Sequence, residues 1–186
     1  MRRDLIAIAG ALAVQAALVA AIPLHESWIR ATGRTILVAV DPVDPYEPLR
    51  GYHADFTYRG IDQSLPGFDG NAADGSSAWV LFGAPRRNEP YAPVRLVSSP
   101  AAAGTAPALR VRYSIDSRFC DETRKRAGCR TLRVTPNAWY ADEASAAAIR
   151  PLLQSHQAVA ELRVTRDGDA SLMALRPFSP GMGSGG

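Results

Sequence analysis

The 186-residue sequence contains few of the side chains that most often carry nucleophilic or metal chemistry. It has two cysteines, three histidines and a single lysine, Lys125. Lys125 stands in the charged run DETRKRAG, which is typical of a solvated loop and not of an apolar pocket that lowers a lysine pKa. A serine–lysine dyad of the signal-peptidase kind is therefore not expected. The formal net charge of +3 is too small to indicate nucleic-acid binding.

Charged residues are absent between Leu5 and Ile22, an apolar run of 18 residues. This length lies near the lower end of what a membrane-spanning helix needs. Arg2 and Arg3 precede the run and favour a cytoplasmic N-terminus, and Trp28 stands where an interfacial anchor would lie. We therefore expect residues 1–30 to form a membrane anchor in the cytoplasmic membrane, with a helix over about 5–25. The rest of the chain is then periplasmic or otherwise extracytoplasmic.

A cleaved signal peptide is the alternative interpretation of the same segment, with Val19-Ala20-Ala21 as the small-residue cleavage site. The apolar run is longer than a typical signal core and no polar region precedes the site, so a retained anchor is favoured. Both interpretations place the body of the protein outside the cytoplasm.

The two cysteines, Cys120 and Cys129, lie close together in FCDETRKRAGC. An even number of cysteines at short spacing in an exported domain indicates a disulfide. Closing so short a loop stabilises the fold by about 2.5–3 kcal/mol in the chain-entropy model. A zinc site needs more nitrogen or sulfur ligands than the segment offers, since no histidine is near. Two free thiols remain as the other possibility.

Beyond the anchor, apolar residues mostly alternate with polar ones, which is the pattern of β-strands. The prediction is a mainly β (α+β) fold over residues 34–178: one antiparallel barrel or sandwich-like domain with about eight strands and one short helix. The helix is expected in ADEASAAAIRPLLQSH, with Asp142 as N-cap and Pro151 as a kink or stop. Asp167-Gly168 between two alternating runs predicts a hairpin. Residues 179–186 are rich in glycine and serine and are predicted to form a flexible tail.

The segment VDPVDPYEPLRGYHADFTY combines several backbone constraints. Each Asp-Pro pair holds the chain extended, and Gly51 permits a turn that other residues disfavour. Arg50 is the expected partner of Asp41 or Asp44, because a guanidinium can bind a carboxylate with two hydrogen bonds. We interpret the segment as a structural clasp between two strands. Its predicted members are Asp41, Asp44, Arg50, Gly51, Tyr52, His53, Phe56 and Tyr58.

This segment, following an anchor helix and the strand TILVAVDPVDP, resembles the signature of the GDYXXLXY-domain family. SAWVLFGAP, RVRYSI and AELRVTRDGDASLMAL extend the similarity along most of the chain. Tyr52 replaces the family aspartate, His53 replaces the first tyrosine, and Phe56 stands for leucine. The resemblance implies a bacterial membrane-anchored protein without an assigned activity, often encoded beside multi-spanning membrane proteins. If the family aspartate has a catalytic or metal-binding role, this chain lacks that role.

Two classes of function follow from these observations. The favoured one is a non-enzymatic, membrane-anchored module that binds an envelope component or a neighbouring membrane protein, for example a multi-spanning one. The alternative is an extracytoplasmic hydrolase, or a protein that binds a cation or another ligand, using the acidic segment from Asp41 to Asp55. Catalytic residues, metal and cofactor are all predicted to be absent, because the three histidines assemble no nucleophile–base set and the carboxylates match no calcium loop. His53 and Asp55 lie two residues apart on one strand face, and His156 is interpreted as a cap of the short helix.

Overall fold

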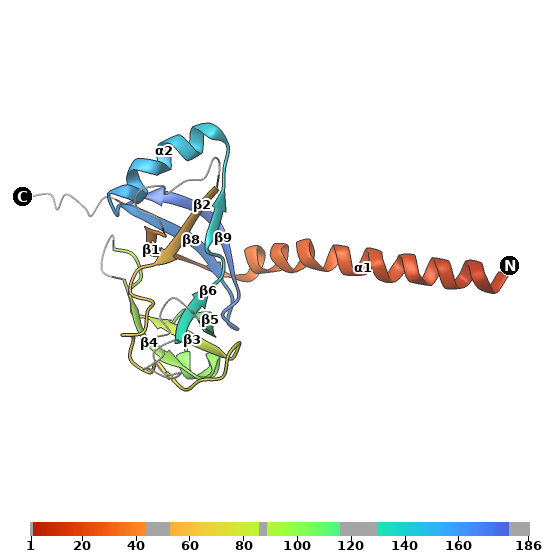
Figure 1. Cartoon of the computed structure of the whole chain (residues 1–186), viewed down its shortest axis with the longest axis horizontal. Helices are drawn as coiled ribbons and strands as arrows, with labels where there is room; N and C mark the ends of the chain where they lie inside the picture. Colours follow the sequence, from red (N-terminus) through yellow and green to blue (C-terminus); the bar gives the residue numbers. More distant parts are fainter. Residues whose placement is uncertain (1, 44–52, 86–88, 116–129, 179–186) are drawn as a thin grey trace, which may run out of the picture.

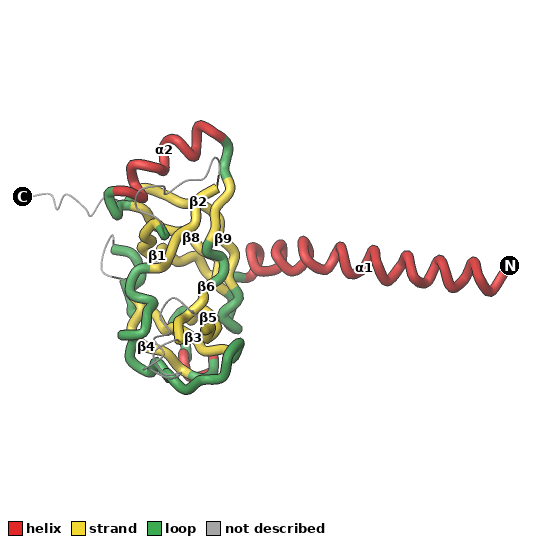
Figure 2. The backbone as a smooth tube through the Cα atoms, in the orientation of Figure 1, coloured by secondary structure: helices red, strands yellow, loops and turns green. Residues whose placement is uncertain are grey.

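The computed structural model describes residues 2–43, 53–85, 89–115 and 130–178, with residues 2–9 and His53 described by their backbone alone. Over these residues the chain forms a long N-terminal helix, α1, that projects from a β-rich body carrying a second helix, α2 (Figures 1 and 2). The elements are α1 (Arg2–Thr32), β1 (Arg34–Pro42), β2 (His53–Tyr58), β3 (Ser77–Phe82), β4 (Pro93–Val97), the 3-10 turn η1 (Pro100–Ala103), β5 (Ala108–Ile115), β6 (Arg130–Val134), β7 (Ala138–Tyr140), α2 (Glu143–Gln154), β8 (Ala158–Val164) and β9 (Ala170–Pro177).

Five strands form one antiparallel sheet in the order β7-β2-β1-β8-β9. Alternate residues of β1, namely Ile36, Val38 and Val40, are buried, as expected for a strand with one face on the core. The two edge strands, β7 and β9, contact each other, so the sheet is nearly closed and barrel-like. Helix α2 lies beside this closure and buries Ile149 and Leu153.

The other four strands form a second antiparallel sheet in the order β4-β3-β5-β6. Three kinds of contact join it to the first sheet. The amide of Tyr91 donates to the carbonyl of Leu37 (2.7 Å). The tip of the β8–β9 hairpin accepts a bond at the Gly168 carbonyl from the amide of Arg110 (2.9 Å) and one at the Asp167 carbonyl from Nε1 of Trp79 (2.7 Å). Finally, residues 135–137 connect β6 of one sheet directly to β7 of the other.

Over the described residues, the hydrogen bonds that join helix α1 to the body lie at its C-terminal end. Arg30 binds Glu26 one turn earlier (3.0 Å) and also donates to the buried Ser171 hydroxyl of β9 (3.2 Å). Arg163 of β8 donates to the carbonyl of Gly33, the single residue between α1 and β1 (3.0 Å). A Cβ at Gly33 would lie 3.0 Å from the backbone nitrogen of Val164, so only glycine permits this close approach.

The predicted fold class is confirmed: the chain is mainly β, antiparallel, with an apolar N-terminal helix and one further short helix. The β8–β9 hairpin turns at Gly168, which has φ +87°, as the Asp-Gly pair predicts. The described residues contain nine strands, whereas the sequence predicts about eight. The additional strand is β7, whose three residues are too few to show a period.

Helix α1 extends beyond its expected end at about residue 25, and helix α2 lies within its predicted segment, where Pro151 does not stop it. Helix α1 continues past 25 to Thr32 because the Glu26–Arg30 pair and the buried Ile29 stabilise its last turns. Helix α2 continues through Pro151 to Gln154, since burying Ile149 and Leu153 offsets the loss of one backbone hydrogen bond. Asp142 is the N-cap as predicted, accepting from the Ser145 amide (2.9 Å).

Candidate functional site

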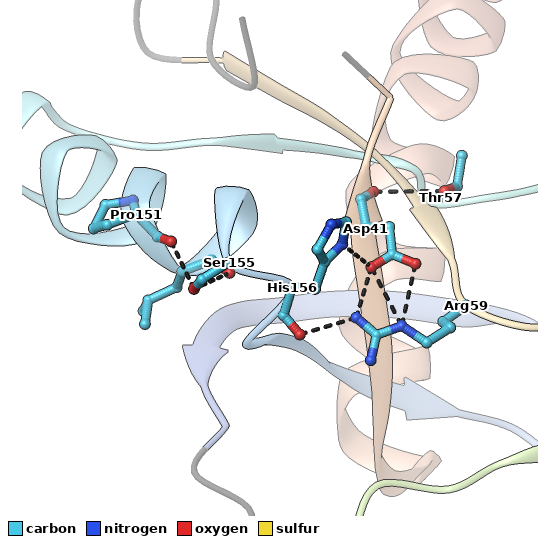
Figure 3. Close-up of polar contacts among 7 residues, drawn as sticks. Asp41, Thr57, Arg59, Pro151, Ser155 and His156 are labelled. Atoms are coloured by element: carbon cyan, nitrogen blue, oxygen red, sulfur yellow. Dashed lines mark hydrogen bonds and ion pairs between the residues drawn. The ribbon is translucent and has the colours of Figure 1, made fainter. Parts of the chain in front are cut away.

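Asp41 lies at the centre of a polar cluster formed by three segments that are distant in the sequence. It stands near the end of β1, Arg59 follows the last residue of β2, and His156 follows α2 (Figure 3). Nε of Arg59 donates to Oδ2 of Asp41 (3.1 Å) and Nη2 donates to Oδ1 (2.6 Å). Nδ1 of His156 lies 2.8 Å from the same Oδ1. Nη2 of Arg59 also donates to the carbonyl of His156 (2.9 Å), so each member contacts both others.

His156 enters this cluster with a backbone conformation that costs free energy in any residue other than glycine. Its amide donates to the carbonyl of Leu153 (3.2 Å), and the next amide, of Gln157, donates to Leu152 (2.8 Å). These two bonds are those of a Schellman motif, whose left-handed residue is usually glycine. His156 adopts φ +57° there, and it alone does so among the described non-glycine residues. The prediction that His156 caps α2 is thus right in position, and the strained backbone directs its ring to Asp41.

The electrostatics of the cluster favour its charged form. The hydrogen-bonded Arg59 guanidinium, together with His156, holds the pKa of the Asp41 carboxyl below its ordinary value despite partial burial. The carboxylate in turn raises the pKa of Arg59. The side chains of Asp41, Arg59 and His156 are 28%, 45% and 60% exposed, so water and salt weaken the attraction.

Of the predicted clasp, the structure describes Asp41, Phe56 and Tyr58 in full and the backbone of His53. Phe56 and Tyr58 are buried in the core, with their rings in an edge-to-face contact 5.5 Å between centroids. The Tyr58 hydroxyl donates to the carbonyl of Pro136, and burial raises the pKa of this phenol. These two signature positions therefore contribute packing.

The remaining clasp residues, Asp44, Arg50, Gly51 and Tyr52, lie outside the described residues, so the pairing of Arg50 stays a prediction. Asp41 has Arg59 and His156 as partners within the described part of the chain. Cys120 and Cys129 also lie outside the described residues. The sequence interpretation missed Arg59, although it follows the signature by one residue. Only the antiparallel pairing of Asp41 with Thr57 in the β1–β2 ladder brings it to Asp41.

An open cleft of about 1150 Å³ adjoins the cluster and lies between the two sheets. One wall comes from β2 and the turn after it, including Asp55, Thr57 and Gln63. The other wall comes from the end of β5 and from β6, including Ile115 and Leu132. Asp41 and Arg59 stand at its rim, so the polar cluster and the cleft form one candidate site.

The chemistry available to the cluster is limited. An imidazole whose Nδ1 is held by a carboxylate has the orientation of a general base, with Nε2 left for a substrate. Nevertheless, among the described residues no serine, threonine or cysteine donates a hydrogen bond to this ring, and no group of three potential metal ligands occurs. The arrangement holds three chain segments together and presents one oriented imidazole to solvent.

A comparison with protein families shows to which family the chain is related. A family model described as GDYXXLXY protein matches residues 15–175. The chain belongs to the GDYXXLXY family. The match runs from the middle of α1 to β9, so the GDYXXLXY family unit includes both sheets, α2 and the domain-proximal half of the helix. No curated protein and no solved structure matches the chain.

Proposed function

We propose that this GDYXXLXY protein is a membrane-anchored, extracytoplasmic and non-enzymatic module that binds a neighbouring membrane protein or an envelope component. The observation that carries the proposal is the exposure of α1. Leu18, Val19 and Ile22 are 66–76% exposed, and the apolar helix projects away from the body (Figure 1). Gly10–Thr32 is long and apolar enough to cross a membrane. Since the body does not cover these side chains, a bilayer would remove them from water at a gain of about 25 cal/mol per Å².

The junction between helix and body supports a role in presenting the domain. Glu26, Arg30 and Ser171 form a hydrogen-bonded group, and Arg163 fixes the carbonyl of Gly33. With one residue between α1 and β1, the domain has little freedom to turn about its anchor. A helix of 31 residues is about 46 Å long, which exceeds the roughly 30 Å hydrocarbon core of a bilayer. The polar last turns then hold the β-rich body just outside the headgroups, with Arg2 and Arg3 inside.

The test is purification of the full-length chain from native membranes in a mild detergent, followed by identification of the co-purified proteins. The control is residues 1–32 carrying the same tag, which reports partners of the anchor alone. A stoichiometric integral-membrane or envelope protein present with the full chain and absent from the control supports the proposal. A monomer that carries a bound ion or sugar and no protein contradicts it.

The second candidate is a hydrolase or ligand-binding protein that uses the acidic segment, and the Asp41–His156 contact favours it. The imidazole is oriented by a carboxylate beside an open cleft, which is how a general base is positioned. His156 does not itself line the cleft, so a substrate there would have to extend past Asp41 and Arg59 to reach Nε2. If this candidate is right, His156→Gln removes activity on a panel of ester and glycoside substrates while the domain stays folded.

A further inference from the structure

The backbone of β6 is open along one edge. Among the strands that the structure describes, β6 pairs with β5 alone, with Leu132 opposite Tyr113 and Arg133 opposite Arg112. The Tyr113 amide donates to Ser76, and its carbonyl accepts from Gly75, so both groups point away from β6. In an antiparallel pair of strands, two residues opposite each other either both point their backbone N–H and C=O groups toward the partner strand or both point them away from it. The amide and carbonyl of Leu132 therefore point away from β5, as do those of Arg130 and Val134.

These outward groups face the cleft between the sheets. The side-chain amide of Gln63, on the opposite wall, donates to the outward carbonyl of Arg130 and so marks that direction. Beyond this point, Leu132 and Val134 line the cleft, and no described residue pairs with their outward amides or carbonyls. An unpaired row of backbone donors and acceptors is a ready template for another extended strand.

The charge beside this edge is unbalanced. Arg112 and Arg133 lie directly opposite each other on one face of the sheet, and like charges in that position are destabilising. Both side chains are exposed, and neither forms an ion pair within the described part of the chain. The neighbouring Arg110 differs, because Asp169 neutralises it. Arg133 therefore offers an unmatched positive charge next to the open edge.

We propose that the edge of β6 receives an extended peptide segment of a partner protein as an additional antiparallel strand, with an acidic residue opposite Arg133. This inference rests on the proposed binding function and names the surface that serves it. The backbone groups of Arg133 point inward to β5, so the incoming residue opposite it forms a non-hydrogen-bonded pair, the position where cross-strand side chains lie closest. A carboxylate there lies beside Arg133 and offsets the like charge of the Arg112–Arg133 pair.

The occupant is a different protein and not a second copy of this chain. Two copies joined antiparallel along β6 would bring Arg133 of each close to the other, adding a further like-charge pair to the existing one.

The experiment places a photoreactive benzophenone amino acid at Thr131 in the full-length protein, in membranes of the cells that naturally make it. Thr131 lies on the same face as Arg133 and borders the cleft. The control position is Val94 on β4, an exposed residue at the opposite edge of the same sheet. Adducts are mapped to residues by mass spectrometry. The expected product joins Thr131 to a short partner segment that contains Asp or Glu, whereas Val94 gives none to that segment.

Two pairs of variants test the backbone and the charge. Leu132→Pro removes the outward amide, and Leu132→Ala removes the same side chain while keeping that amide. The adduct is expected to disappear in the first and to persist in the second. Arg133→Glu is expected to lower its yield about threefold to tenfold, while Arg133→Lys keeps most of it. Thermal unfolding of each variant confirms that the domain is folded.

Four outcomes overturn the inference: no adduct from Thr131, an adduct within this chain or with a second copy, an adduct that survives Leu132→Pro, or a yield unchanged by Arg133→Glu. If Leu132→Pro does not fold, the Arg133 pair decides alone. A protein that co-purifies with the full chain and reacts only from Val94 refutes the β6 edge and leaves the proposed function standing. Absence of any co-purified partner refutes the proposed function itself.

Discussion

Arg59 binds Asp41 with two hydrogen bonds, from Nε to Oδ2 at 3.1 Å and from Nη2 to Oδ1 at 2.6 Å. The pair joins the end of β1 to the residue after β2, and through His156 it also joins α2. It is a polar contact next to the family signature, and its contribution to the stability of the domain can be measured.

A double-mutant cycle of Arg59→Ala and Asp41→Asn is expected to give a coupling of about 0.5–1 kcal/mol at pH 7, since the pair is partly exposed. Because the folded-state pKa of Asp41 is lowered, this contribution is present above the ordinary carboxyl pKa of about 4. It is lost as the pH falls below that value and through the lowered one. Urea denaturation of the four proteins across this pH range measures the coupling free energy. A coupling that grows on acidification would contradict a stabilising Asp41–Arg59 pair.

At His156, backbone strain is predicted to destabilise the fold while the contact of the ring with Asp41 stabilises it. His156→Gly removes both, whereas His156→Ala removes the contact and keeps a side chain at φ +57°. The glycine variant should therefore be about 1 kcal/mol more stable than the alanine variant. Carbon-detected NMR titration should show the Asp41 pKa rising in both variants, and rising further in Arg59→Ala. Equal stability of the two variants would argue against a strained residue 156.

Gly168 is predicted to be required for docking the β8–β9 hairpin on the second sheet. A Cβ there would lie 2.6 Å from Cδ1 of Trp79 and 2.8 Å from the amide of Arg110, at φ +87°. Gly168→Ala should cost about 2–4 kcal/mol, from strain plus the clash. Gly75 is the matched control: its φ is +76° and nothing lies within 4 Å, so Gly75→Ala should cost only about 1–2 kcal/mol. Similar losses in both variants would show that the hairpin contact is loose.

The Cys120–Cys129 disulfide remains a prediction from the sequence. Non-reducing peptide mapping should find the two cysteines linked within one chain, and Cys120→Ser should cost a few kcal/mol at most, because the closed loop is short. Complete alkylation of both thiols without a reductant would show that the bridge is absent.

Much of the fold could be predicted because its strands alternate and its turns use glycine. RTILVAVD, ALRVRYSI and AVAELRVT are strands at almost the expected residues, and the Asp167-Gly168 turn is a hairpin. Strand β7 was missed because three residues carry no period. Helix α1 extends beyond the apolar run to Thr32, where Ile29 is buried, and helix α2 continues past Pro151, where Leu153 is buried, so tertiary burial sets both ends.

The candidate site was harder to predict than the fold. Asp41 was singled out by its rigid Asp-Pro context, but Arg59 and His156 reach it only through the β1–β2 register and the left-handed turn after α2. Such contacts join positions up to 115 residues apart, which no local pattern encodes. The open edge of β6 likewise follows from sheet order, since the sequence RTLRV does not reveal whether a strand is central or at an edge.

The central claim is that an uncleaved α1 holds the domain outside the cytoplasmic membrane. The most direct measurement treats intact spheroplasts with protease and determines the mass of what remains in the carbonate-washed membrane. The account predicts one protected fragment that begins at Met1 or Arg2 and ends close to Thr32, where the helix meets the β-rich body. A full-length chain that survives until the cells are lysed would place the domain inside, and a soluble mature protein that begins near Ile22 would show that the helix is a cleaved signal; either result contradicts the claim.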